Sequence, residues 1–199
     1  MKYTRAIFLK SIAELTALPE DSGIEVAFAG RSNAGKSSAL NTITGVKALA
    51  KTSKTPGRTQ LINFFSLGDI EDNRFLVDLP GYGYAKVAAS IKKHWEEILN
   101  QYISTRDSLK GIMLVIDIRH PLKQNDLQMI EWCTYQQHNI HILLTKADKL
   151  TKNHANKALF DVEKNLKKYG DLVSVQKFSA VTKEGLTEAH NKLDLWFGF

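Results

Sequence analysis

The sequence contains a single cysteine among its 199 residues and no long uninterrupted hydrophobic run. One cysteine excludes an intramolecular disulfide and fits a reducing compartment. No apolar run is long enough to cross a bilayer, and the first residues lack the apolar core and cleavage site of a secretory signal. We therefore expect a cytoplasmic protein. Cys133 stands in an apolar helical stretch, so we expect a buried, unreactive thiol there rather than a nucleophile.

Internal repeats, low-complexity stretches and domain linkers are also missing. The length and an ordinary apolar content of 43% predict one globular domain over residues 1–199, with a short N-terminal extension over about 1–22. The spacing of Phe8, Ile12 and Leu15 in that extension favours a helix packed on the domain. A formal net charge of +6 is compatible with a polyanionic partner, and equally with a basic, solvated surface.

A phosphate-binding pattern, G-x-x-x-x-G-K-S, occupies residues 30–37. Its glycines, Gly30 and Gly35, permit turns that are closed to residues with a Cβ atom. Lys36 would bring a compact charge to the β- and γ-phosphates, and Ser37 would offer its hydroxyl to Mg²⁺ at a helix N-terminus. A glycine-rich turn that binds nothing is disfavoured, because a strand pattern precedes the loop and a helix pattern follows it.

Strand and helix patterns alternate through the rest of the chain, which predicts βαβ crossovers and a mostly parallel sheet with helices on both faces. A polar turn at 68–73 predicts a hairpin, so one strand should run antiparallel. Six strands are expected at 24–29, 59–67, 74–78, 111–117, 139–144 and 173–178, with helices at 36–43, 90–105, 124–137, 153–169 and 184–197.

Four polar motifs follow strands of this sheet, and parallel sheets bind ligands outside the carboxyl ends of their strands. They are the phosphate loop, Asp78 with Gly81, residues 145–148, and Ser179 with Ala180. Asp78 is placed to hold Mg²⁺ through water, and the backbone N–H of Gly81 to reach the γ-phosphate. Their expected meeting at one edge is the strongest indication of a nucleotide site.

Residues 145–148 resemble the guanine-reading box Asn-Lys-x-Asp, with Thr145 in the asparagine position. The carboxylate of Asp148 could accept two hydrogen bonds from the N1–H and amino group of guanine, a donor pair that adenine lacks. Lys146 could lie along the base plane. A threonine hydroxyl can still brace the loop, although with fewer hydrogen bonds than asparagine. An ATP-using enzyme is therefore disfavoured.

A long polar loop over residues 46–58 precedes the second strand, and loops of this length are usually functional. Thr59 is our choice for a switch threonine that completes the Mg²⁺ shell when a γ-phosphate is present, with Thr52 and Thr55 as competitors. The basic residues of this segment either meet RNA or solvate the loop; they are Lys47, Lys51, Lys54 and Arg58.

Together, the runs at 30–38, 54–60, 78–85 and 144–149 resemble the EngB family of bacterial GTPases over nearly the whole chain. The resemblance implies a three-layer, Ras-like P-loop GTPase fold, Mg²⁺-dependent binding and hydrolysis of GTP, a role in late assembly of the large ribosomal subunit, and a need in cell division and septation. It implies that Ser37 and Thr59 are Mg²⁺ ligands and that Lys36, Thr59 and Gly81 serve catalysis. The implied nucleotide contacts are Gly30, Arg31, Ser32, Asn33, Ala34, Gly35, Lys36, Ser37, Ser38, Gly57, Arg58, Thr59, Gln60, Leu61, Asp78, Leu79, Pro80, Gly81, Thr145, Lys146, Ala147, Asp148, Phe178, Ser179 and Ala180.

Tyr82 stands where Ras-like enzymes carry the glutamine that orients the attacking water, so we expect slow intrinsic turnover. Asn33 either helps to hold a K⁺ ion that stimulates hydrolysis or only shapes the loop. Tyr82, Tyr84 and Trp95 either dock a partner or pack internally.

The leading interpretation is a GTPase switch on the large subunit and its RNA, acting as a monomer. The alternative is a nucleotide-gated binding protein of the division or envelope machinery with negligible turnover. We interpret the lysines of the later helix as a solvated face rather than a binding surface; they are Lys152, Lys157, Lys164, Lys167 and Lys168.

Overall fold

The computed structural model describes residues 2–51, 61–68, 73–83 and 89–199, with side chains of the second helix from residue 97 onward. Its strands are β1 (Ala6–Ile12), β2 (Ile24–Gly30), β3 (Ile62–Leu67), β4 (Arg74–Asp78), β5 (Leu109–Asp117), β6 (Ile140–Thr145) and β7 (Val173–Lys177). Its α-helices are α1 (Lys36–Thr44), α2 (Ala89–Thr105), α3 (Gln124–Tyr135), α4 (Lys152–Leu166) and α5 (Leu186–Phe197). Short 3₁₀ helices lie at Lys2–Arg5, Leu15–Ala17, Ala147–Lys149 and Lys167–Leu172.

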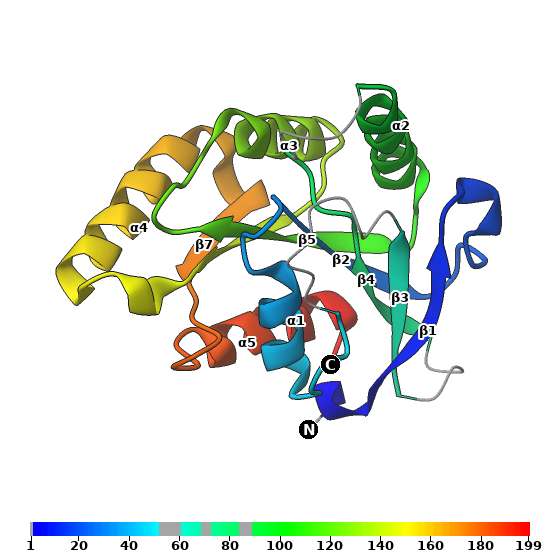
Figure 1. Ribbon diagram of the computed structural model, residues 1–199, viewed down its shortest axis with the longest axis horizontal. Coiled ribbons are helices and arrows are strands. Elements are labelled where there is room, and N and C mark those ends of the chain that lie inside the picture. The colour runs from blue at the N-terminus through cyan, green and yellow to red at the C-terminus, as the bar shows by residue number, and fades with distance from the viewer. Residues whose placement is uncertain (1, 52–60, 69–72, 84–88) are drawn as a thin grey trace.

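The strands form one sheet in the order β1-β3-β4-β2-β5-β6-β7 (Figure 1). Only β3 runs against the others, because it pairs antiparallel with both β1 and β4, while the remaining pairs are parallel. The predicted hairpin of β3 and β4 is therefore confirmed. The α/β class, with helices on both faces, is confirmed as well.

Two hydrophobic cores, one on each face of the sheet, hold the layers together. In β5, Ile112 and Leu114 join the core beneath α2, α3 and α4, while Met113 and Val115 join the core beneath α1 and α5. This alternation follows from the period of two in a strand, and it explains why β5 is apolar at nearly every position. Cys133 lies fully buried in the first core, and burial raises the pKa of its thiol to about 12, as expected for an unreactive side chain.

The N-terminal extension departs from the sequence prediction of a helix and gives the sheet a seventh strand. Residues 6–12 form β1, which pairs with β3 and is interrupted by a bulge between Phe8 and Lys10. The bulge breaks the two-residue alternation of burial that would identify a strand, so that Phe8 is exposed while Ile12 is buried. The open edge of β3 thus decided the conformation of this segment, overriding its local pattern.

A buried charge cluster fixes the extension and the end of α2 to the start of β2. Arg106 contacts the fully buried Glu25 at 2.5 Å and donates to the carbonyl oxygens of Pro19 and Glu20. The phenol of Tyr102 donates to the same carboxylate at 2.6 Å. The charged groups of Arg106 and Glu25 therefore lie in a hydrogen-bond network, as buried charges require.

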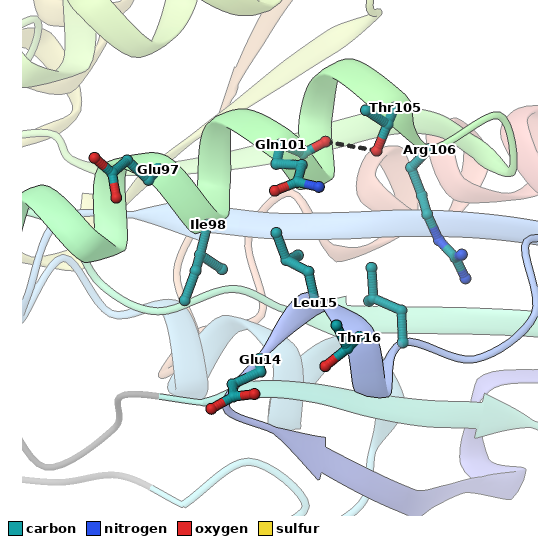
Figure 2. A pocket seen from close by; sticks show the side chains of 9 residues that line it. Glu14, Leu15, Thr16, Glu97, Ile98, Gln101, Thr105 and Arg106 are labelled. Atoms are coloured by element: carbon teal, nitrogen blue, oxygen red, sulfur yellow. Dashed lines mark hydrogen bonds between the residues drawn. The ribbon is translucent and has the colours of Figure 1, made fainter.

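Between the extension and α2 lies a pocket of about 620 Å³, lined by Leu15, Ile98 and Arg106 among others (Figure 2). It contains no residue of the phosphate loop or of the other predicted nucleotide motifs. Within the described part of the chain, no helix combines the length and the apolar character needed to span a bilayer.

Candidate nucleotide-binding site

The phosphate loop joins β2 to α1, as the sequence predicted. Gly35 has a φ of 100°, in the left-handed region that glycine tolerates. Gly30 is the last residue of β2 and has no such conformation, although a Cβ atom is excluded there as we expected. It is constrained by space instead, because a Cβ atom there would lie 2.6 Å from the carbonyl oxygen of Val115. The first glycine therefore lets β2 approach β5, and the second shapes the loop.

Lys36 and Asp78 meet at the carboxyl end of the sheet. Their ammonium and carboxylate groups form a hydrogen-bonded ion pair, although 42 residues separate them in the chain. Asp78 is the last residue of β4 and is 3% exposed, and Lys36 is the first residue of α1. The fold thus brings the predicted phosphate-binding cation next to the predicted acidic group for Mg²⁺.

These residues fit a Mg²⁺ ion bound together with a nucleotide. Ser37 follows Lys36 in the first turn of α1, and Lys36 is the residue that pairs with Asp78. The described residues contain no cluster of three or more histidine, cysteine or acidic side chains. That donor set suits a P-loop site, in which a hydroxyl and phosphate oxygens supply ligands, better than an all-protein metal cage.

Thr145 connects the guanine-reading box to the phosphate loop. Its buried hydroxyl lies 2.5 Å from the carbonyl oxygen of Ala34 and 3.1 Å from that of Ile116. Its Oγ1 would also lie 3.5 Å from a Cβ atom placed on Gly35. The predicted brace is therefore present, and it spans two motifs that would hold opposite ends of one nucleotide.

Asp148 and Ser179, the residues predicted to read the base, contact each other. The Ser179 hydroxyl donates to Asp148 at 2.7 Å and accepts from the backbone N–H groups of Val181 and Thr182. The hydrogen bond from Ser179 lowers the pKa of Asp148, with a smaller contribution from Lys149 at 3.3 Å. The carboxylate is thus oriented and stays ionised at neutral pH, as an acceptor of two guanine hydrogen bonds must be.

Backbone hydrogen bonds hold the loop containing Ser179 against the guanine-reading box. The Ala147 N–H donates to the carbonyl oxygen of Phe178 at 3.2 Å, and the Phe178 N–H donates to that of Leu144 at 2.9 Å. The side chain of Phe178 is fully buried. Phe178 therefore anchors this loop, and any contact it makes to a nucleotide would come from its backbone.

Asp117 has a position that sequence reasoning missed. Its carboxylate lies 2.8 Å from the ammonium of Lys146 and accepts three hydrogen bonds from Arg119, two from the guanidinium and one from the backbone N–H. Burial opposes ionisation of Asp117, but the hydrogen bonds from Arg119 and Lys146 outweigh it and hold its pKa well below the usual range. Lys146 also donates to the carbonyl oxygen of Asn33 at 2.7 Å. The sequence signal that could have identified Asp117 was its position at the end of β5, where the other predicted site residues also follow strands.

Tyr82 is tied to the phosphate loop and to α3. Its backbone exchanges hydrogen bonds with Gly30 and Ser32, and its phenol donates to Asp126 at 3.0 Å. Asp126 is fully buried and also accepts from the backbone N–H of Lys123, in a capping box at the start of α3. Burial and the neighbouring Asp126 raise the pKa of Tyr82 well above its usual value. The phenol of Tyr82 thus packs internally.

The remaining predicted contacts divide between described and undescribed residues. The side chain of Leu79 is buried in the core and therefore does not face a ligand. Its backbone N–H donates to the carbonyl oxygen of Phe28. Leu61, immediately before β3, is 36% exposed. The predicted switch threonine and its neighbours lie outside the described residues; they are Gly57, Arg58, Thr59 and Gln60.

Comparison with known proteins agrees with this geometry. Residues 25–146 match the family model described as "50S ribosome-binding GTPase". A "Probable GTP-binding protein EngB" of Coxiella burnetii is 54% identical over 98% of this chain and 94% of its own length. This chain belongs to the EngB family of GTP-binding proteins. A Francisella philomiragia member is also 54% identical, over 99% of this chain and its own full length.

Solved structures support the P-loop GTPase fold of this family member. A crystal structure of a probable GTP-binding protein engB covers 87% of this chain and 98% of its own, with a TM-score of 0.66 at 16% identity. Aquifex aeolicus Era, solved with GDP and AlF₄⁻, covers 86% of this chain and 56% of its own, with a TM-score of 0.68 at 19% identity. At these identities the likeness concerns the fold.

Proposed function

We propose that this protein is a cytoplasmic, Mg²⁺-dependent GTPase switch that assists late assembly of the large ribosomal subunit and is needed for normal cell division. One observation carries the proposal: the phosphate-loop pair of Lys36 and Asp78 and the base-reading pair of Asp148 and Ser179 stand at the same sheet edge, linked by Thr145. The name of the matching family model supports a ribosomal partner.

In this proposal Lys36 holds the β- and γ-phosphates, while Ser37 and, through water, Asp78 hold the metal. Thr59 completes the coordination shell of the metal when a γ-phosphate is present. When bound, Mg²⁺ supplies charge neutralisation on the phosphate oxygens. Asp148 selects guanine, and Lys146, fixed by Asp117, flanks the base.

Slow intrinsic turnover is part of the proposal, and the contact between Tyr82 and Asp126 supports it. A phenol that donates to a buried carboxylate of α3 is not available to orient water at a γ-phosphate. Contact with the ribosomal subunit would then accelerate hydrolysis.

Stimulation by K⁺ through Asn33 is a separate element of the proposal. Asn33 is exposed and has a φ of 62°, and its carbonyl oxygen accepts from Lys146, which supports the loop-shaping role equally well. Asn33→Gly keeps the left-handed conformation and removes the carboxamide. If K⁺ is held there, hydrolysis should be faster in KCl than in NaCl for the wild type, and the difference should vanish in Asn33→Gly. Equal wild-type rates in the two salts would remove this element.

The main test is co-sedimentation with purified large ribosomal subunits in a non-hydrolysable GTP analogue, in GDP and without nucleotide, together with phosphate release with and without subunits. We expect binding that requires the GTP analogue, and faster release with subunits. Asp148→Ala, which should fold but lose guanine binding, is the control. Nucleotide binding without subunit binding in any state would contradict the ribosomal role. No turnover under any condition would favour the alternative of a nucleotide-gated binding protein.

A further inference from the structure

The exposed face of α4 carries a phenylalanine between lysines. Asn153, Lys157, Phe160, Lys164 and Lys167 follow one another at intervals of four and three residues, which places them along one side of the helix. All five are exposed, and Phe160 is 64% exposed. We call this stripe the α4 face. The opposite side of α4, through Ala155, Val162 and Leu166, is buried in the core against the sheet.

The lysines of the α4 face differ from their neighbour Lys168, because they have no ion-pair partner among the described residues. In the part of the chain that the structure describes, Lys157, Lys164 and Lys167 form no ion pair. By contrast, the neighbouring Lys168 lies 3.8 Å from Glu131 and over the ring of Tyr169. The acidic residues of the helix, Asp161 and Glu163, fall on either side of the stripe at helical spacing and not within it. The stripe therefore carries three lysines that form no ion pair with any described residue, while Asp161 and Glu163 flank it at intervals of three and four residues.

The aromatic ring changes what this charge can bind. A single exposed phenylalanine is ordinary, and lysines alone would fit the solvated surface expected from the sequence. Here Lys157 and Lys164 lie about 10 Å apart along the helix axis, with the ring of Phe160 between them. Single-stranded RNA offers a matching pair of groups, since its phosphates attract lysines and its unpaired bases stack on aromatic rings.

We infer that the α4 face is a contact site for single-stranded RNA, with one base stacked on Phe160 and phosphates against Lys157, Lys164 and Lys167. A membrane surface is a poorer occupant, because a helix that lies on a bilayer inserts a whole apolar side, and that side of α4 is packed in the core. The biological setting of this site rests on the proposed ribosomal function.

The position of α4 predicts how the contact depends on nucleotide. α4 packs beside β7 at one edge of the sheet, whereas β3, the strand that follows the predicted switch threonine in the chain, lies next to the opposite edge (Figure 1). The α4 face is thus remote from the part of the fold where a γ-phosphate signal is expected. RNA binding there should be the same in GDP and in a GTP analogue.

Fluorescence anisotropy with a labelled 12-nucleotide oligoadenylate tests the site on the full chain. Phe160→Ala should weaken binding by roughly five- to a hundredfold, and Phe160→Trp should restore it. Phe160→Leu, which keeps an apolar side chain but no ring, should bind as weakly as Phe160→Ala. Leu195→Ala removes a 72% exposed apolar side chain from α5, on the other face of the sheet, and should change nothing.

The lysines should be visible in the salt dependence. The triple variant with glutamine at Lys157, Lys164 and Lys167 should have a shallower salt dependence. The slope of log affinity against log salt concentration should decrease in magnitude by roughly 2, since each phosphate contact on a single strand contributes about 0.7 to it. Phe160→Ala should leave that slope unchanged. Lys110→Gln, at an exposed lysine near the start of β5, is the charge control.

Wild-type affinity in Phe160→Ala would overturn the inference, as would full binding by Phe160→Leu or a preference for anionic vesicles over the oligonucleotide. All these positions are exposed, and thermal melting with GDP binding verifies that each variant is folded. The two proposals fail separately. Oligoadenylate binding without sedimentation on ribosomal subunits would contradict the ribosomal function and keep the RNA site. If the protein binds no oligonucleotide but sediments with subunits, and Phe160→Ala sediments equally well, the RNA site is contradicted and the ribosomal function is kept.

Discussion

Replacing Thr145 by valine tests whether one hydroxyl fixes the phosphate loop against the guanine-reading box. Valine keeps the shape of threonine and removes only the O–H group. In the wild type this buried hydroxyl has a single proton and two carbonyl oxygens in reach, those of Ala34 at 2.5 Å and Ile116 at 3.1 Å. Losing such a buried bond, with an acceptor left unpaired, costs about 1 to 3 kcal/mol.

The expected result has two parts. Because the bond exists without nucleotide, Thr145→Val should lower the free energy of unfolding of the nucleotide-free protein by about 1 to 3 kcal/mol. Because the two linked loops would hold opposite ends of one ligand, GDP affinity should also fall, by roughly five- to tenfold for a loss of about 1 to 1.4 kcal/mol in positioning. Urea denaturation and titration with a fluorescent GDP analogue measure the two effects.

Thr145→Ser is the matched control, since it keeps the hydroxyl and should bind GDP like the wild type. A Thr145→Val protein with wild-type stability and wild-type GDP affinity would refute the reasoning. Reduced stability with unchanged affinity would show that the bond supports the fold without positioning the ligand.

Three further predictions concern buried groups. Burial lowers the pKa of His141 from 6.5 to about 4, so the unfolded chain takes up a proton first, and stability should fall by up to about 3 kcal/mol as pH drops from 6.5 to 4; His141→Asn should flatten a pH series of urea melts, and an unchanged slope would contradict this. Arg106→Met strands the fully buried Glu25 and should cost about 3 to 5 kcal/mol in thermal or urea unfolding, whereas a loss below 1 kcal/mol would mean that the pair is dispensable. Tyr82→Phe removes only the bond to Asp126, so intrinsic phosphate release should stay within about twofold while stability falls by about 1 kcal/mol; a tenfold slower release would place the phenol in the chemistry.

The fold and the chemical motifs were predictable from the sequence because both are recorded locally. Alternating strand and helix patterns specify crossovers, and parallel connections put the ends of β2, β4 and β6 at one edge whatever the details of packing. The meeting of Lys36 with Asp78, and of Asp148 with Ser179, follows from that topology. The sequence also provided the residue types whose chemistry suits phosphate, metal and guanine.

Other features were decided only by the tertiary structure, because they depend on partners distant in the chain. Residues 6–12 became a strand because β3 offered an open edge, against their own helical spacing. The Thr145 hydroxyl donates to Ala34, which is 111 residues away in the chain, and the Tyr82 phenol donates to Asp126, which is 44 residues away. The sequence shows which side chains can donate or pack, but the arrangement of elements decides which of them are covered, and it left Phe160 uncovered among its lysines.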